Sequence, residues 1–405
     1  MTITHPALAA SLVVLVLLAP PAEAKRDRDV RVVKLKVGPI PIEANRDREI
    51  CQAIPLPGIG GLEIVSAEAR SRISRKRKVA SHHLVVYGYD GPNGDAFPTE
   101  MIDEPGCAGV GPPDFYANRT FLAGSGGESL RGRWSVTNIS YPGDLAQAVP
   151  RVTGTDDAVL LVNSHYFNVS KKRAKGVVKI TLKLKPLTPG KRLVRQVTHL
   201  DASRDIFVPP GEAGAVASSL QADGAYNPFT EGNTNPAGDV CVFTLATHMH
   251  KRGTRFWIDW EQDGARTELI SWPDYIHPGL VFRPGPLRGL LRAFDAANGF
   301  PRIYYGCDFA NGVDGREVKM GCEEVPGEAP GLSWAEAEPL GIDATESHAR
   351  PCGLDAANCD GTPCVPANLV FGPLSDDDMC VLTAVVYDPL PGVAPEQACD
   401  LLASF

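Results

Sequence analysis

Short runs of alternating hydrophobic and polar residues dominate the chain, and most are rich in β-branched side chains. This period of two predicts β-strands with one buried face. Clusters of Gly, Pro, Asn and Asp separate the runs and long helical periods are scarce, which favours antiparallel sandwiches over a parallel sheet covered by helices. The clearest predicted strands are 31–37, 84–87, 159–162, 177–184, 240–245 and 381–387.

The pattern predicts two consecutive antiparallel β-sandwich domains of jelly-roll type. The 405 residues allow two or three domains at roughly 150 residues each. A Pro209-Pro210-Gly211 turn follows one set of strands and precedes another. We therefore expect an N-terminal domain over 25–204 and a C-terminal domain over 205–405. Residues 323–367, rich in Cys, Gly and Pro, are expected to be an insertion into the second domain.

The first 24 residues predict a cleaved signal peptide. Residues 7–18 are apolar and uncharged, and the small-x-small sequence Ala22-Glu23-Ala24 follows them. The apolar run is shorter than the roughly 20 residues of a membrane span, so an uncleaved anchor is the weaker alternative. No later segment predicts a span, and we expect the mature chain to be soluble and exported.

Charge and cysteine content narrow the partners and the compartment. With 48 acidic and 40 basic residues the net charge is -8, which argues against nucleic acid as the principal partner. Ten cysteines are ordinary for an exported protein with five disulfides. The cysteine spacing within the insertion lacks the tight ligand pairs of common zinc modules, so disulfides are favoured there. The basic run 70–78 is interpreted as a solvated strand face, with an anion site as the alternative.

Five histidines adjoin predicted strands, namely His82, His83, His165, His248 and His250. Residues two apart on a strand project from one face, so His248 and His250 can bind a single ion. Adjacent residues on a regular strand point to opposite faces, so His82 and His83 can share a metal only at a strand end or an irregularity. For a single histidine such as His165, a structural role is the alternative.

Met379 adds a sulfur atom to these candidate ligands. It follows three Asp residues and lies just ahead of the predicted strand 381–387. A thioether is a soft ligand that suits Cu(I). Imidazoles together with one thioether indicate copper.

The order of these motifs resembles the copper type II, ascorbate-dependent monooxygenases, which include peptidylglycine α-hydroxylating monooxygenase and dopamine β-hydroxylase. The resemblance covers most of the mature chain. In order, it rests on Cys51 in ICQAIPLP, His82-His83, His165 in SHYFN, the Pro-Pro-Gly-Glu turn at Pro209, His248-x-His250-x-x-Gly253, Cys307 in IYYGCDFANG, and Phe371-Gly372 before DDDMC.

The resemblance implies a monooxygenase with two copper ions per chain. His82, His83 and His165 would hold the copper that receives electrons from ascorbate or another donor. His248, His250 and Met379 would form the catalytic site, where O2 reacts and a C–H bond of a small-molecule or peptide substrate is hydroxylated. Solvent would separate the two sites, one on each domain.

Three departures from the family pattern bear on the substrate. Peptide-amidating members carry an Arg two positions before His-x-His, which can hold a substrate carboxylate. They also carry Asn and Tyr two and four positions after the Met ligand. Here these positions are Ala246, Val381 and Thr383, which argues against amidation of glycine-extended peptides. No amine-binding carboxylate for a catecholamine is specified either, so the substrate stays open.

The resemblance also implies two disulfides, Cys307–Cys380 and Cys241–Cys399. Cys51 and Cys107 are then the only cysteines left in the N-terminal domain, and we expect them to pair, which departs from the family's connectivity. Two further bridges would join the remaining cysteines in and beside the insertion, namely Cys322, Cys352, Cys359 and Cys364.

Two alternatives to an enzyme stay open: a non-catalytic copper carrier of the same fold, and a structural or carbohydrate-binding sandwich whose histidines are incidental. Two chemically different sites favour the enzyme, because a carrier needs only one. Export predicts a periplasmic or extracellular protein. Asn118, Asn138 and Asn168 begin glycosylation sequons. A glycan on Asn168, three residues after His165, would crowd that ligand, which favours a bacterial source.

Overall fold

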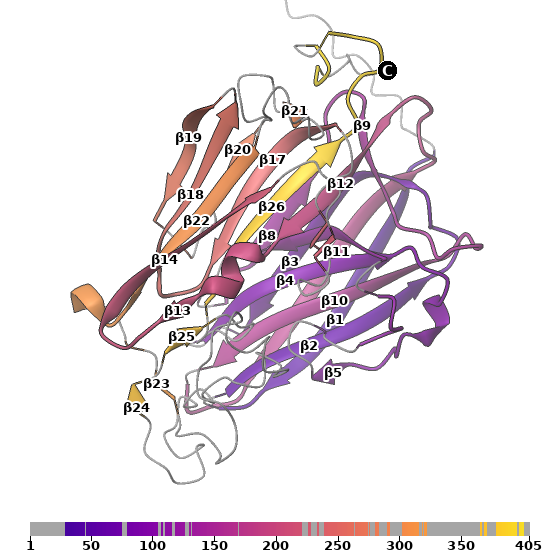
Figure 1. Ribbon diagram of the computed structural model, residues 1–405. Helices are drawn as coiled ribbons and strands as arrows, with labels where there is room; N and C mark the ends of the chain where they lie inside the picture. The colour runs from indigo at the N-terminus through magenta and orange to yellow at the C-terminus, as the bar shows by residue number, and fades with distance from the viewer. Residues whose placement is uncertain are drawn as a thin grey trace, which may run out of the picture.

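Most of the described residues lie in β-strands, as a computed structural model shows (Figure 1). The structure describes residues 29–44, 46–74, 79–103, 107, 110–115, 118–125, 129–130, 132–168, 170–220, 226–227, 233–234, 239–262, 264–273, 275, 280–282, 290–291, 302–315, 318, 320–321, 365–366, 368–370, 378–394 and 397–400. The predicted signal peptide, Cys322 and the three cysteines of the insertion lie outside the described residues. Within the described part of the chain, no helix has the length and hydropathy needed to cross a membrane.

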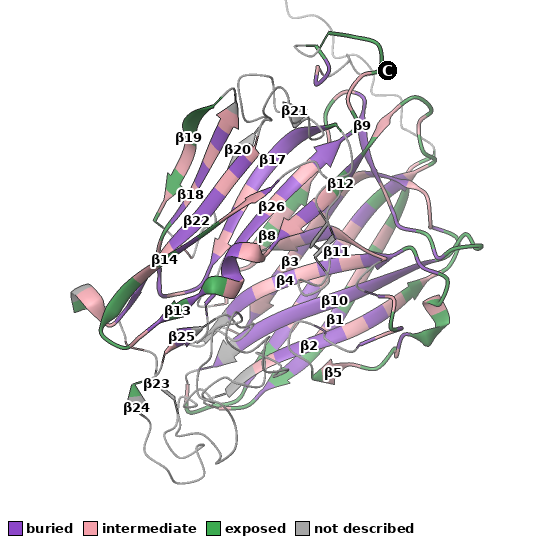
Figure 2. Ribbon diagram, in the orientation of Figure 1, coloured by how far each residue is buried: buried purple, intermediate pink, exposed green. Residues whose placement is uncertain are grey.

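The first sandwich packs two sheets against each other. One sheet has the strand order β1 (Arg31–Ile42), β11 (Ala174–Lys185), β3 (Glu63–Ile73) and β9 (Leu145–Ala148), with β8 (Ser135–Ile139) paired to β3. The other has the order β5 (Ile102–Asp103), β2 (Arg46–Leu56), β10 (Ala158–Asn168), β4 (Val79–Tyr89) and β6 (Arg119–Ser125), with β7 (Ser129–Leu130) paired to β4. Alternate side chains such as Ile180 and Leu160 fill the core between them, and Figure 2 shows this alternation along the strands.

The second sandwich follows the same plan. One layer contains β12 (Arg192–His199), β26 (Cys380–Tyr387), β17 (Val240–Met249), β20 (Leu280–Phe282) and β21 (Leu290–Leu291). The facing sheet has the order β14 (Glu212–Leu220), β22 (Arg302–Asn311), β18 (Gly253–Gln262) and β19 (Ala265–Trp272). Leu245, Leu382, Phe256 and Tyr305 are buried in the core between the two layers. The predicted all-β, two-sandwich fold class is confirmed.

The remaining elements are short. Three two-stranded ribbons pair β13 (Phe207–Val208) with β25 (Leu369–Val370), β15 (Tyr226–Asn227) with β16 (Asn233–Thr234), and β23 (Met320–Gly321) with β24 (Val365–Pro366). Single 3-10 turns form η1 (Gly94–Ala96), η3 (Asp201–Asp205) and η4 (Val313–Gly315).

Strand β12 joins the two sandwiches into one structure. Its first residues, Arg192 and Leu193, pair in parallel with β9, and the rest of the strand pairs antiparallel with β26. One continuous sheet of ten strands therefore runs through both sandwiches. The sequence placed the division between residues 204 and 205. The change of strand partners instead occurs earlier, at β12, because the Pro-rich turn that suggested the boundary comes after this strand.

The side chain of Arg192 fastens this junction. Its Nε donates to Oδ2 of Asp144 at 2.7 Å, and Nη2 donates to the carbonyl oxygen of Asp400 at 2.6 Å. Nη1 donates to the carbonyl oxygens of Asp388 and Ala398. The side chain of Asp144 is 1% exposed, so this ion pair is largely shielded from water. One guanidinium thus links β12, the loop before β9 and the C-terminal segment.

Every cysteine in the described part of the chain is disulfide-bonded, and the three pairs are Cys51–Cys107, Cys241–Cys399 and Cys307–Cys380. All three predicted pairings are confirmed. Cys307 on β22 and Cys380 on β26 lie on facing layers of the second sandwich, so their bond ties the layers together next to Met379.

Candidate metal centre

A β-bulge in β4 brings His82 and His83 to one face of their sheet. His83 pairs with His165 of β10, whereas Tyr166 pairs with Ser81, so His82 is the extra residue of the bulge. Ser81 hydrogen-bonds to Ser71 inside the core, and Leu84 is buried in the same core three positions later. A regular strand would need an even spacing between them. The sequence-based expectation that these adjacent histidines can share a metal only at an irregularity agrees with this geometry.

The three histidines of the first sandwich are arranged to hold an ion. One ring nitrogen from each of His82, His83 and His165 lies within 4.8 Å of the others. The ring centroids are 5.4 Å apart for His82 and His83, and 5.1 and 5.2 Å from the ring of His165. Metal–nitrogen bonds of about 2 Å require nitrogens within about 4 Å of each other, so small side-chain rotations complete the site.

Asn163 and Glu49 orient the ring of His83. Nδ2 of Asn163 donates to Oε1 of Glu49 at 2.7 Å, which leaves Oδ1 of Asn163 as the acceptor for Nε2 of His83 at 2.8 Å. Since Nε2 then carries the proton, Nδ1 of His83 is the nitrogen available to a metal. Oε2 of Glu49 also lies 3.9 Å from Nδ1 of His165.

Glu49 is a buried carboxylate behind the histidines. Burial by itself would raise its pKa, but the hydrogen bond and positive charge of His83, with further help from His165 and Asn163, lower the pKa to about 2. It is therefore ionised and supplies negative charge beside the candidate ligands. Neither Glu49 nor Asn163 was predicted from the sequence. Asn163 could have been predicted, because it lies two residues before His165 and therefore projects from the same face of the strand. Glu49 could not, because it lies beside His165 only through the register of β2 with β10.

His248 and His250 come from the end of β17 in the second sandwich. Met249, between them, is buried in the core of that sandwich, so the two imidazoles lie on the opposite face. Their ring centroids are 5.1 Å apart. The sequence prediction that this pair converges on one point is consistent with that geometry.

A tight turn holds the end of β17. The backbone N–H of Gly253 donates to the carbonyl oxygen of His250 at 3.0 Å. A Cβ atom at Gly253 would lie 2.5 Å from Sδ of Met249 and 3.1 Å from that carbonyl oxygen. The glycine of the His248-x-His250-x-x-Gly253 motif therefore lets the turn close against the strand that carries both histidines.

Asp378 fixes the backbone on both sides of this second group. Its fully buried carboxylate accepts hydrogen bonds from the backbone N–H groups of His250 at 2.8 Å, Met379 at 2.9 Å and Arg252 at 3.1 Å. Burial raises its pKa to about 7, against the lowering effect of these hydrogen bonds and of the Arg252 charge. The run of Asp residues before Met379 is evident in the sequence, but no role for Asp378 was predicted from it.

Met379 lies on the same face as the two histidines of β17. Cys380 pairs with Met249 and both point into the core, while His248 pairs with Val381 on the other face. Alternation along the strand places Met379 with Val381, next to the end of β17. Its side chain is half-buried.

The two groups of histidines form one contiguous cluster. The ring of His82 lies 5.1 Å from that of His250 and 6.4 Å from that of His248. The resemblance implied two sites with solvent between them, and this expectation is wrong for the structure described. The continuous sheet through β12 joins the two sandwiches, and the ring distances show that the two groups of histidines lie against each other.

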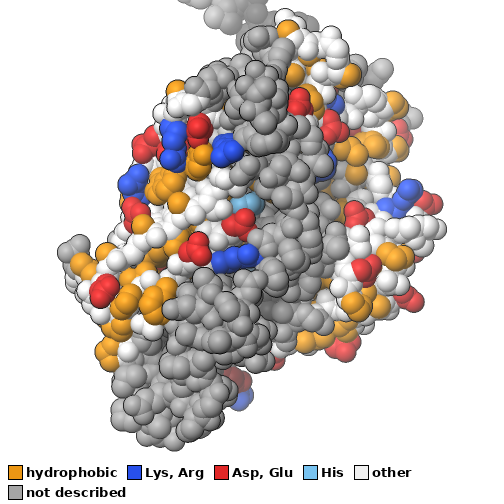
Figure 3. All heavy atoms as spheres, in the orientation of Figure 1, with side chains coloured by type: hydrophobic (Ala, Val, Ile, Leu, Met, Phe, Trp, Pro, Cys, Tyr) orange, Lys and Arg blue, Asp and Glu red, His pale blue; other side chains and the backbone are white. Residues whose placement is uncertain are grey.

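The cluster is mostly buried but not sealed. The side chain of His165 is 1% exposed and that of His83 is 15% exposed. Figure 3 shows one histidine side chain at the surface near the centre of this face, beside acidic and basic side chains. The partial exposure of His83 itself could let a small molecule approach part of the cluster.

Burial keeps the imidazoles of His82 and His248 uncharged. It lowers the pKa of His82 well below its usual value, and the neighbouring histidines, His250 first among them, lower it further. Burial, followed by the charge of His83, lowers the pKa of His248 to about 4. Neutral imidazole is the form that binds a metal ion. Imidazole nitrogens are ligands that transition metals use, so the cluster could hold a metal ion.

Comparison with known proteins reveals no relative in sequence: no protein family matches the chain, and no curated protein does. Among solved structures, it is similar to the major capsid protein P2 of bacteriophage PM2, with 10% identity, a TM-score of 0.28, and coverage of 69% of this chain and 95% of the other. The structure of Broad Bean Stain Virus has 8% identity and a TM-score of 0.32, with coverage of 91% of this chain and 92% of the other. PNGF-II has 9% identity and a TM-score of 0.32, with coverage of 69% of this chain and 61% of the other. At these TM-scores the likenesses carry no argument about function.

Proposed function

We propose that this protein is an exported, copper-dependent monooxygenase that uses O2 and electrons from ascorbate or another donor to hydroxylate a C–H bond of a small-molecule or peptide substrate. The observation that carries the proposal is the convergence of five imidazoles from both sandwiches, with Met379 on the face of the second pair. A structural role for the histidines alone does not explain this gathering of metal donors.

The donor set fits two copper ions. His82, His83 and His165 would hold one, because imidazoles suit both oxidation states of copper. His248, His250 and Met379 would hold the other, where the thioether favours Cu(I). When bound, copper supplies the one-electron chemistry that lets O2 attack a C–H bond.

The surrounding residues hold these donors in place. Asn163 and Glu49 fix the ring and proton of His83, and Asp378 fixes the backbone of His250 and Met379. Such outer contacts orient ligands and tune a metal site. Because the rings of His82 and His250 are neighbours, the two ligand groups would act as one centre rather than as two remote ones.

A copper carrier is the second candidate. A carrier needs a single site, and the contact between His82 and His250 allows the cluster to be interpreted as one. The chemical difference between an all-nitrogen group and a group with a thioether favours the enzyme.

We also propose that the protein acts in a periplasm or outside the cell, and that its source is bacterial. Three disulfides support an oxidising compartment. Asn168 is fully buried, and its Nδ2 donates to the carbonyl oxygens of Glu43 at 2.6 Å and Lys172 at 2.9 Å. A folded chain could not carry a glycan on that nitrogen, which supports a source where the sequon is not read.

Copper stoichiometry followed by turnover tests the proposal. We expect mature protein reconstituted anaerobically to bind two Cu(I) per chain, and to consume O2 with ascorbate when a substrate is present. Binding of one ion or none would contradict the two-ion centre. Two bound ions without O2 consumption across a broad panel of substrates would favour the carrier.

A further inference from the structure

The outer face of three neighbouring strands is strongly basic, although the whole protein is acidic, with a net charge of -8. The outward positions of β1, β11 and β3 carry Lys34, Lys36, Lys175, Lys179, Lys183, Arg70 and Arg72. Glu68 pairs with Arg70 at 3.3 Å. This one face is therefore positively charged, although the net charge of the protein is negative.

The strand register sets three cations in a row. Lys36 of β1 lies opposite Lys179 of β11, and Lys179 lies opposite Arg70 of β3. Neighbouring strands are about 4.8 Å apart. Like charges directly opposite each other destabilise a sheet. The fold tolerates this repulsion at a position where neutral residues would be more stable.

Trp134 holds some of these cations without cancelling their charge. The guanidinium carbon of Arg72 lies 4.4 Å from the centroid of its ring, that of Arg70 lies 5.2 Å away, and Nζ of Lys179 lies 5.5 Å away. Each such contact at an exposed site is a weak attraction between the cation and the face of the ring. The indole positions the cations and leaves their positive charge available.

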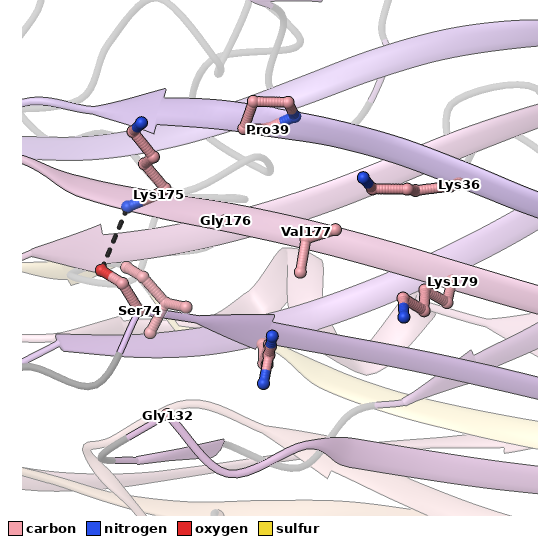
Figure 4. A pocket seen from close by; sticks show the side chains of 10 residues that line it. Lys36, Pro39, Ser74, Gly132, Lys175, Gly176, Val177 and Lys179 are labelled. Carbon is pink, nitrogen blue, oxygen red and sulfur yellow. Dashed lines mark hydrogen bonds between the residues drawn. The ribbon is translucent and has the colours of Figure 1, made fainter.

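A pocket opens among the same side chains, with a volume of about 560 Å³. Lys36, Arg72, Lys175 and Lys179 line it, and among the described residues that line it none is acidic. Figure 4 shows Lys36 on β1 and Lys175 and Lys179 on β11 around it, with Oγ of Ser74 accepting a hydrogen bond from the backbone N–H of Lys175 at 3.2 Å. The volume lies within the range of about 300–1,000 Å³ that is typical of small-molecule sites.

We infer that this pocket binds a small ligand that carries several phosphate or sulfate groups. Four cations face one volume, so a monocarboxylate would neutralise only a fraction of their charge. Lysine acts as a point charge and the arginine fork is planar, and together they suit the oxygens of tetrahedral oxyanions. Both sheets of the first sandwich separate the pocket from the histidine cluster, so the inference does not depend on the proposed copper chemistry.

Calorimetric titration of the metal-free, full-length protein tests this inference. Tripolyphosphate and a disulfated disaccharide represent the two sources of the ligand, and citrate is the carboxylate probe. We expect Lys36→Gln combined with Lys179→Gln to weaken binding by about tenfold or more. The matched control combines Lys34→Gln with Lys183→Gln. It removes the same charge from the same two strands outside the pocket, and should change affinity by less than about twofold.

The outcomes separate clearly. Preference for tripolyphosphate would assign a phosphorylated ligand, and preference for the disaccharide a sulfated glycan. Failure of both probes to bind, an equal loss in the control pair, or equally tight binding of citrate would overturn the inference. We also expect the pocket pair to raise the Tm of the ligand-free protein, because it removes the opposed charges; a lower Tm would assign these lysines to the fold instead.

Discussion

The imidazole ring of His82, on β4, lies 5.1 Å from that of His250, at the end of β17, although the two strands belong to different sandwiches. His82 is equally close to His165 within its own sandwich. It therefore occupies the meeting point of the two candidate ligand groups. Its position as the extra residue of a bulge is what allows one ring to contact both.

This central position predicts different effects for two adjacent histidines. His82→Ala should reduce copper retention in both ligand groups, because its ring contacts each of them. His83→Ala should affect the first group alone. Copper per chain after anaerobic loading and dialysis measures the difference. Equal losses from the two variants would show that the groups are not joined through His82.

Met379→Ile should lower copper affinity modestly and abolish hydroxylation, because isoleucine has similar volume but no donor atom. If Met379 only packs its strand, the change should cost less than about 1.5 kcal/mol and leave turnover near normal. X-ray absorption on the reduced protein would detect sulfur near copper. His248→Ala provides the comparison: it should also stop turnover, with a larger loss of copper.

The stability of the metal-free protein should depend on His248 in acid. Its pKa is lowered from 6.5 to about 4 by burial and by the charge of His83. Between these pH values the unfolded chain binds a proton that the folded chain does not, so the free energy of unfolding falls as the pH falls. This histidine contributes on the order of 3 kcal/mol to that loss. Denaturant unfolding at pH 7 and pH 4.5 measures it, and His248→Gln should lose less than the wild type.

Asp378 should have the opposite pH dependence. Burial raises its pKa from 3.8 to about 7, so the folded chain holds a proton that the unfolded chain has released. Its contribution to stability is present in full below pH 3.8 and is lost as the pH rises through 7. The asparagine of the Asp378→Asn variant does not titrate. The free energy of unfolding of this variant, relative to wild type, should therefore rise by on the order of 4 kcal/mol between pH 3.8 and pH 7. If the free energy of unfolding had the same pH dependence in the two proteins, the raised pKa of Asp378 would be wrong.

Local pattern predicted much of this structure. Alternation along 177–184 and 381–387 identified β11 and β26, and the three observed disulfides were expected from the resemblance and from the cysteines left over. The requirement for an irregularity at His82-His83 followed from strand geometry alone. These features depend on neighbours in sequence or on motif order, which a single sequence contains.

The features that were missed depend on long-range pairing. Glu49 reaches His165 and His83 only because β2 lies beside β10 in one particular register. Asp378 contacts the backbone of His250 across more than a hundred residues of chain. The contact between His82 and His250 depends on how the two sandwiches pack. No periodicity in the sequence encodes that packing.

Strand β12 pairs with strands of both sandwiches, and this determines where the chain can be truncated to produce the second sandwich. A truncation that begins at residue 205 would keep β26 but remove the strand that covers its edge, leaving a row of backbone N–H and C=O groups open to other chains. It would also remove Arg192, which ties down the C-terminal segment. We expect such a fragment to aggregate or to exchange strands with its copies. A fragment that begins before β12 would keep that edge covered, and is the better starting point for producing the second sandwich on its own.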